Sequence, residues 1–144
     1  LEENRTQVGS GRVPLRFGLG VNWLAIPGAA LSARFEQVRW SEMNGLGTSA
    51  VNARDATELA IGTDVLGPKV GGVNSVVRAG FRTRTLPFTA LSNDVSERSF
   101  SFGAGIPLAR GRAQIDLGAQ RASRSAGSVD ERAWLVSLGF GIRP

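Results

Sequence analysis

The sequence predicts an all-β fold, an antiparallel meander of about seven long strands forming part of a transmembrane β-barrel of the bacterial outer-membrane type. Three observations support this prediction. Apolar side chains recur at every second position in several runs, as they do on one face of a β-strand. Most runs reach the length of about 9 to 11 residues that a tilted strand needs to cross a bilayer. The connections between the runs alternate between short and long.

The first three runs lie in the N-terminal half of the chain, at 13–23, 31–40 and 57–66. In the first run the apolar residues on one face are Val13, Leu15, Phe17, Leu19, Val21 and Trp23. The second run loses its phase between Phe35 and Val38, which predicts a β-bulge there. The third run alternates more weakly.

Four further runs follow, at 77–84, 99–108, 113–120 and 134–142. The last has large apolar residues at every second position: Trp134, Val136, Leu138, Phe140 and Ile142. The residues between them are mostly small. One apolar face and one small or charged face are what a barrel wall needs between lipid and interior.

The connections predict how the strand ends are sorted. Short turns are expected at 27–28, 67–72 and 110–111, and longer polar loops at 43–55, 85–95 and 123–130. Outer-membrane barrels have short periplasmic turns and long extracellular loops. Trp23 precedes a short turn, while Trp40 and Trp134 adjoin long loops, so we expect these three side chains to anchor the protein at the two membrane interfaces.

The other face of the strands is predicted to line the barrel interior. Its candidate lumen-facing residues are Arg16, Arg78, Arg82, Arg84, Gln114 and Asp116. The arginines of 78–84 either line a pore that favours anions or belong to an ion-paired wall, with Asp116 and Glu58 as partners. We favour the ion-paired wall. The glycine pairs 18/20, 103/105 and 139/141 fall on the same face, where a missing side chain relieves crowding or admits a plug.

The composition excludes several classes of function. The chain has neither Cys nor His, so thiolate chemistry, the commonest general base and the commonest metal ligand are missing. We expect no enzyme, no cofactor and no metal site. The net charge is +5, but the arginines are scattered singly along the chain, so we expect no nucleic-acid partner.

The domain organisation is predicted to be simple. Residues 1–144 form a single β-barrel segment, with 1–10 as a loop or a segment that leads into the first strand. The chain begins at Leu1 rather than Met and shows no signal-like segment, so we interpret it as the C-terminal fragment of a larger barrel. About seven strands alone would leave two unpaired edges, which lipid does not tolerate. The missing strands of the same protein, or another copy, are therefore expected partners.

Three segments resemble the C-terminal half of the FadL/TodX-type outer-membrane transporters of hydrophobic compounds. They are LSARFEQVRWS at 31–41, FSFGAGIPLARGRAQIDLGAQRAS at 100–123 and WLVSLGFGIRP at 134–144. The resemblance implies half of a fourteen-stranded barrel that imports long-chain fatty acids or related apolar compounds. The chain ends in Arg143-Pro144 rather than in the terminal aromatic residue common among such barrels, so Phe140 is the candidate assembly signal.

Three functional hypotheses follow. The first is a passive transporter of hydrophobic small molecules in the bacterial outer membrane, with membrane lipid and the barrel assembly machinery as partners. The second is a barrel with a structural or assembly role. The third is a soluble β-barrel that binds a ligand, which the mean hydropathy of −0.04 leaves open.

Overall fold

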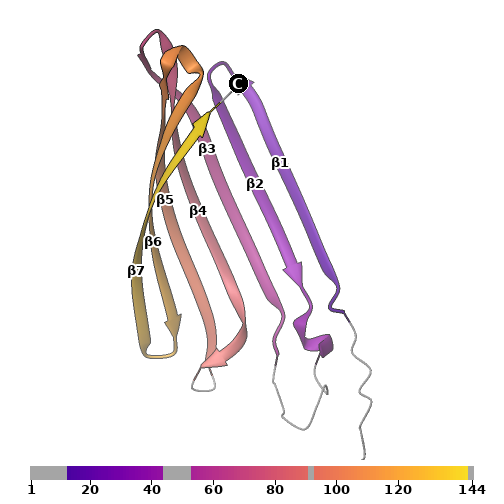
Figure 1. Cartoon of the computed structure of the whole chain (residues 1–144). Coiled ribbons are helices and arrows are strands. Elements are labelled where there is room, and N and C mark those ends of the chain that lie inside the picture. The colour runs from indigo at the N-terminus through magenta and orange to yellow at the C-terminus, as the bar shows by residue number, and fades with distance from the viewer. Residues whose placement is uncertain (1–12, 44–52, 91–92, 143–144) are drawn as a thin grey trace, which may run out of the picture.

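The computed structural model describes residues 13–43, 53–90 and 93–142. These residues form one seven-stranded antiparallel sheet in which every strand pairs with its neighbours in the chain (Figure 1). The strands are β1 (Arg16–Ile26), β2 (Ala29–Val38), β3 (Ala56–Val70), β4 (Val73–Ala90), β5 (Asn93–Leu108), β6 (Ala113–Ala126) and β7 (Val129–Ile142). The predicted all-β meander is confirmed. The predicted leading segment 1–10 and most of the predicted loop 43–55 lie outside the described residues.

Two short helical segments interrupt the meander. They are the 3-10 turns η1 (Trp40–Met43), after β2, and η2 (Ala109–Gly111), between β5 and β6. Within the described part of the chain, no helix is both long and apolar enough to cross a membrane.

The upper end of the sheet in Figure 1 has three tight connections, at 27–28, 71–72 and 109–112. Gly71 and Gly72 both have positive φ, at 60° and 83°, as the primed turns of two-residue hairpins require. Gly28 has φ 79° because it follows Pro27 at the third position of its turn, where a type II turn requires positive φ. The short turns predicted at this end are confirmed, although β3 continues through the glycine-containing segment as far as Val70.

At the opposite, lower end, the predictions of two long loops are wrong. Instead of a loop at 85–95, β4 continues to Ala90 and β5 begins at Asn93. Instead of a loop at 123–130, β6 continues to Ala126 and β7 begins at Val129. Apart from Leu86 and Phe88 in β4, these extensions hold few large apolar residues, but their backbones still pair, with Thr89 opposite Asp94 and Ala126 opposite Val129.

The predicted bulge between Phe35 and Val38 is also wrong. Both ladders of β2 keep an unbroken register through this stretch, from Phe35 opposite Leu19 to Val38 opposite Arg16 on one side, and from Leu59 to Ala56 on the other. The register shifts lie near strand ends instead, between Trp23 and Ile26, between Leu66 and Lys69, and between Thr85 and Thr89. Because the register does not shift in this stretch, Val38 lies on the same face as Arg16.

The register gives the sheet two chemically different faces, since residues directly opposite each other share a face. Phe81 on β4 lies opposite Ile61 on β3 and Phe100 on β5, and one row of the other face runs from Asp64 through Arg78 to Gly103. The first, which we call the apolar face, holds the large exposed side chains Leu19, Val21, Trp23, Leu31, Leu59, Ile61, Phe100, Phe102, Leu117, Trp134, Val136, Leu138 and Phe140. The second is the charged face.

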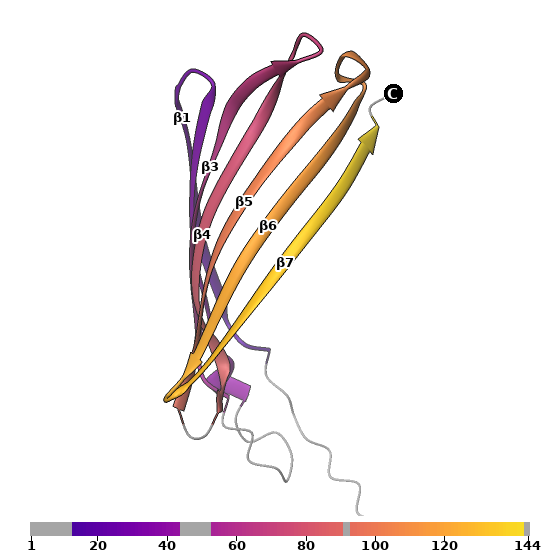
Figure 2. The ribbon, with the colours of Figure 1, turned by 90° about the vertical axis from the view of Figure 1, so that its left-hand side faces the viewer.

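The sheet is twisted and open. Figure 2 shows β5, β6 and β7 running at a slant to β1. In the described ranges β1 pairs only with β2 and β7 only with β6, so the sheet does not close. The buried side chains are few and cluster on the charged face of β5, where Val95, Glu97 and Ser99 are 3 to 4% exposed.

Candidate functional site

The charged face brings together all six residues predicted to face the lumen. Arg16 lies on β1, Arg78, Arg82 and Arg84 lie on β4, and Gln114 and Asp116 lie on β6. Direct pairing along the ladders, such as Arg82 with Ser99 and Gly105 with Asp116, places them on the same side of the sheet. They therefore share one face of the sheet, although Arg16 on β1 lies several strands away from Gln114 and Asp116 on β6.

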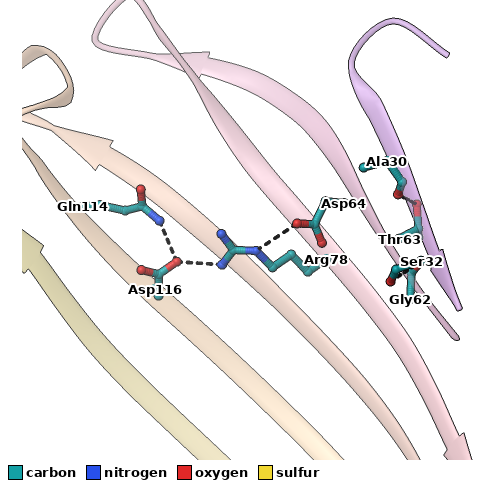
Figure 3. A network of polar contacts seen from close by, with 8 residues as sticks. All are labelled: Ala30, Ser32, Gly62, Thr63, Asp64, Arg78, Gln114 and Asp116. Atoms are coloured by element: carbon teal, nitrogen blue, oxygen red, sulfur yellow. Dashed lines mark hydrogen bonds and ion pairs between the residues drawn. The ribbon is translucent and has the colours of Figure 1, made fainter. Parts of the chain in front are cut away.

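Arg78 is the centre of a polar network across β3, β4 and β6 (Figure 3). Its Nη1 donates to Oδ1 of Asp116 at 2.9 Å, and its Nε lies 3.7 Å from Oδ2 of Asp64. The side-chain amide of Gln114 donates to the same Oδ1 of Asp116 at 2.7 Å. Asp116 was predicted as a partner for these arginines, and here it holds one of them in place.

Glu97 on β5 is the centre of a second network. Its Oε2 accepts from Nη2 of Arg124 at 2.7 Å, and its Oε1 lies 2.8 Å from Nη2 of Arg84 and 3.5 Å from Nη2 of Arg82. The Glu97 side chain is only 5% exposed. Sequence reasoning missed Glu97 because the predicted loop ended at 95 and the predicted strand began at 99, so Glu97 was assigned to neither face. It named Glu58 as a partner instead, which lies opposite Arg84 in the ladder.

A third network lies on β1 and β2 at the same face. Nη2 of Arg16 is 2.8 Å from Oε1 of Glu36, and Arg34 donates to the other oxygen of this carboxylate. All four arginines predicted to line the lumen therefore have carboxylate partners. The ion-paired wall describes this face, because its positive charges are compensated locally rather than presented to anions.

Glycines provide the space that these networks need. A Cβ at Gly105 would lie 2.8 Å from Nε2 of Gln114 and 2.9 Å from Oδ1 of Asp116. A Cβ at Gly118 would lie 2.6 Å from Oγ of Ser137. Relief of crowding therefore explains these glycines, whereas nothing lies within 4 Å of the corresponding position at Gly141.

A hollow of 840 Å³ opens at the lower end of the charged face. Apolar side chains line most of it, among them Val38, Trp40 and Leu86, and the side chains of Arg16 and Arg84 also reach it. Trp40 belongs to η1 and is half-buried in this lining. A concave, mostly apolar wall with a few polar groups is the usual form of a small-molecule site.

The remaining predicted residues lie on the apolar face. Trp23 is near the upper end of β1 and Trp134 is in the lower half of β7, inside the strand rather than beside a loop, and they are 53% and 70% exposed. The guanidinium of Arg121 lies over the ring of Trp134, 5.8 Å from its centroid. Phe140 is opposite Ile115 near the end of β7 and is exposed.

One carboxylate outside the strands is held by the turn that precedes β3. Asp55 accepts from Oγ of Ser41 at 2.6 Å and from the Ser41 backbone N–H at 3.1 Å. These hydrogen bonds hold the pKa of Asp55 below its usual value, because they favour the ionised carboxylate. They tie η1 to the start of β3.

Comparisons of the chain with protein-family models, curated proteins and solved structures give no match. The resemblance to the FadL/TodX-type transporters therefore stays a prediction from the sequence. The geometry of the two faces and the hollow is the basis on which a function can be argued.

Proposed function

We propose that this chain forms part of a transmembrane β-barrel in the bacterial outer membrane, and that the barrel passes hydrophobic small molecules without acting as an enzyme. The observation that carries the proposal is the apolar face. It extends across all seven strands of the described sheet, and its arginines, Arg98, Arg121 and Arg132, lie at its lower end.

On β5 and β7 the apolar face is long enough for a membrane belt, and on β3 it is shorter. On β7 it covers 134–142, on β5 100–108 and on β3 59–65, and polar residues follow toward the lower end on each strand. A stretch of about 9 to 11 residues crosses a bilayer when the strand is tilted. The strands themselves are longer, up to 18 residues in β4, so they extend beyond this belt at the lower end.

The exposure of this face is the strongest argument against a soluble role. Phe100 and Phe102 are 63% and 62% exposed, and Leu138 is 76% exposed. Burial of a side chain of this size stabilises a fold in water by about 1.5 to 3 kcal/mol, so a soluble domain would cover such a surface. Lipid is the cover that fits an apolar face of this extent.

The open edges support the same proposal. The β1 and β7 edges each present a row of unpaired backbone groups over 11 and 14 residues. In a bilayer each unpaired group costs several kcal/mol. We therefore include further strands, from the same protein or from another copy, among the required partners, together with the barrel assembly machinery that inserts such proteins.

The hollow supports the hydrophobic substrate class. Val38, Trp40 and Leu86 offer an apolar wall, and the guanidinium groups of Arg16 and Arg84 lie beside it. An aliphatic chain would pack on the apolar wall, and its polar head would lie beside the ion pairs of Arg16 with Glu36 and of Arg84 with Glu97. A long-chain fatty acid has this chemistry.

The test is saturable binding of a fluorescent long-chain fatty acid by the protein reconstituted in phosphatidylcholine vesicles. We expect saturable binding that Val38→Arg weakens at least tenfold, since a charged side chain would fill the apolar wall. Trp23→Ala, at the other end and on the other face, is the control and should leave binding unchanged. Absence of saturable binding by the wild-type protein, once it is inserted, would refute the transport role.

A structural or assembly barrel is the second candidate, and the ion-paired charged face favours it. The networks of Arg78 and Glu97 connect β3, β4, β5 and β6 through ion pairs, which suits a scaffold as well as a conduit. A stable protein partner that co-purifies, together with a lumen that passes no solute, would support this candidate over transport.

A further inference from the structure

Three arginines lie at the lower edge of the apolar face, on β5, β6 and β7. Arg98 and Arg132 both lie opposite Ser123, one on each side of β6, and Arg121 precedes Ser123 by two residues, between Phe100 and Trp134. We call Arg98, Arg121 and Arg132 the arginine triangle. All three residues are exposed.

The register sets the size of the triangle. Arg121 is the diagonal neighbour of Arg98 on one side and of Arg132 on the other. Diagonal neighbours in an antiparallel pair are about 7 to 8 Å apart, which long side chains easily span. The Arg121 guanidinium is held over Trp134, so at least one of the three charges has a fixed position.

The arginine triangle differs from the arginines of the charged face in its charge balance. Within 13–43, 53–90 and 93–142, no ion pair involves Arg98, Arg121 or Arg132. Asp130, the carboxylate next along β7 on this face, lies in the row of Ser125 and makes no ion pair with them. Like charges on neighbouring strands repel, so an external anion would stabilise this arrangement.

We infer that the arginine triangle binds the phosphate groups of anionic lipid headgroups. This inference rests on the proposed membrane location. The triangle lies where the apolar rows of β5, β6 and β7 end, which is the depth at which headgroups meet the acyl chains, and Trp134 beside it is a typical interface residue. Arginine is the side chain best suited to phosphate, since its planar donors bind two oxygens at once.

The experiment uses the full chain in vesicles of phosphatidylcholine mixed with phosphatidylglycerol, followed by native mass spectrometry of the lipids that stay bound. We expect the wild-type protein to retain the anionic lipid in excess over its share of the mixture. Arg98→Gln with Arg132→Gln should reduce that enrichment roughly tenfold, as the loss of two charges near an anionic surface predicts. Arg110→Gln with Arg112→Gln removes the same charge at the upper end and should leave the enrichment in place.

Each outcome separates this inference from the membrane proposal. Protection from protease in vesicles of phosphatidylcholine alone reports insertion, and its absence in the wild-type protein would refute the membrane location and the lipid site together. Insertion without enrichment of phosphatidylglycerol would overturn the lipid site only. An equal loss of enrichment in the two double variants would also overturn it, because net charge would then explain the binding. The enrichment of phosphatidylglycerol by the wild-type protein is measured against its share of the lipid mixture, so this measurement does not depend on whether a variant folds.

Discussion

Arg124 donates to a single carboxylate oxygen of Glu97 from two atoms, Nε at 3.1 Å and Nη2 at 2.7 Å. The other oxygen of Glu97 faces Arg82 and Arg84. One nearly buried carboxylate thus ties β4, β5 and β6 together at the lower end of the charged face.

Loss of the Glu97 charge should destabilise the sheet. Glu97→Gln leaves three guanidinium groups without their shared partner, and we expect the free energy of unfolding to fall by about 2 kcal/mol. Urea unfolding of the protein in vesicles, followed by tryptophan fluorescence, measures this. Glu131→Gln is the control, since Glu131 lies on the same face opposite Arg124 but is exposed. Equal effects of the two substitutions would contradict the central role of Glu97.

Two glycines of the charged face should respond differently to the same substitution. Gly105→Ala places a Cβ against Gln114 and Asp116, whereas Gly141→Ala meets nothing within 4 Å. We expect the first variant to lose about 1 to 2 kcal/mol of stability and the second to be near neutral. The same urea titration measures both. A neutral Gly105→Ala would show that the network of Arg78 and Asp116 is loose.

An arginine should destabilise the inserted protein more on the apolar face of β7 than on its charged face. Leu138→Arg places a charge in the middle of the apolar face and should reduce the stability of the inserted protein by about 2 to 4 kcal/mol. Leu135→Arg places the same charge on the opposite face, where Leu135 lies opposite Gln120, and should cost much less. Unfolding in vesicles separates the two variants. If Leu135→Arg costs more than Leu138→Arg, the apolar face is not the lipid-facing one.

The contact between Ser41 and Asp55 predicts a local pH dependence. Folding lowers the pKa of Asp55, so its stabilising effect is present above the ordinary carboxyl pKa and is lost as the pH falls through the folded pKa. Ser41→Ala removes the hydroxyl donor and should raise the pKa of Asp55 toward its ordinary value. A titration of the Asp55 carboxyl carbon by NMR measures both proteins. An unchanged pKa in Ser41→Ala would assign the shift to Arg39 or to the backbone donor instead.

The amino-acid sequence alone predicted the meander, the strands with an apolar face, the tight turns and the common face of Arg16, Arg78, Arg82, Arg84, Gln114 and Asp116. It did so because alternation with a period of two is a local property. Once one residue of a strand is assigned to a face of the sheet, the faces of all the other residues in that strand follow. Phe17 and Leu19 must share a face whatever their partners are.

Which residues lie opposite one another on neighbouring strands depends on the tertiary structure. The extensions of β4, β5, β6 and β7 look like loops in the sequence, since they hold few large apolar residues apart from Leu86 and Phe88, and the pairing of their backbones makes them strands. Glu97 therefore became visible as the partner of Arg82, Arg84 and Arg124 only when the ladders were in register. The absence of a bulge in β2 was decided in the same way, because an intact ladder on both sides outweighs a break in the apolar pattern of one strand.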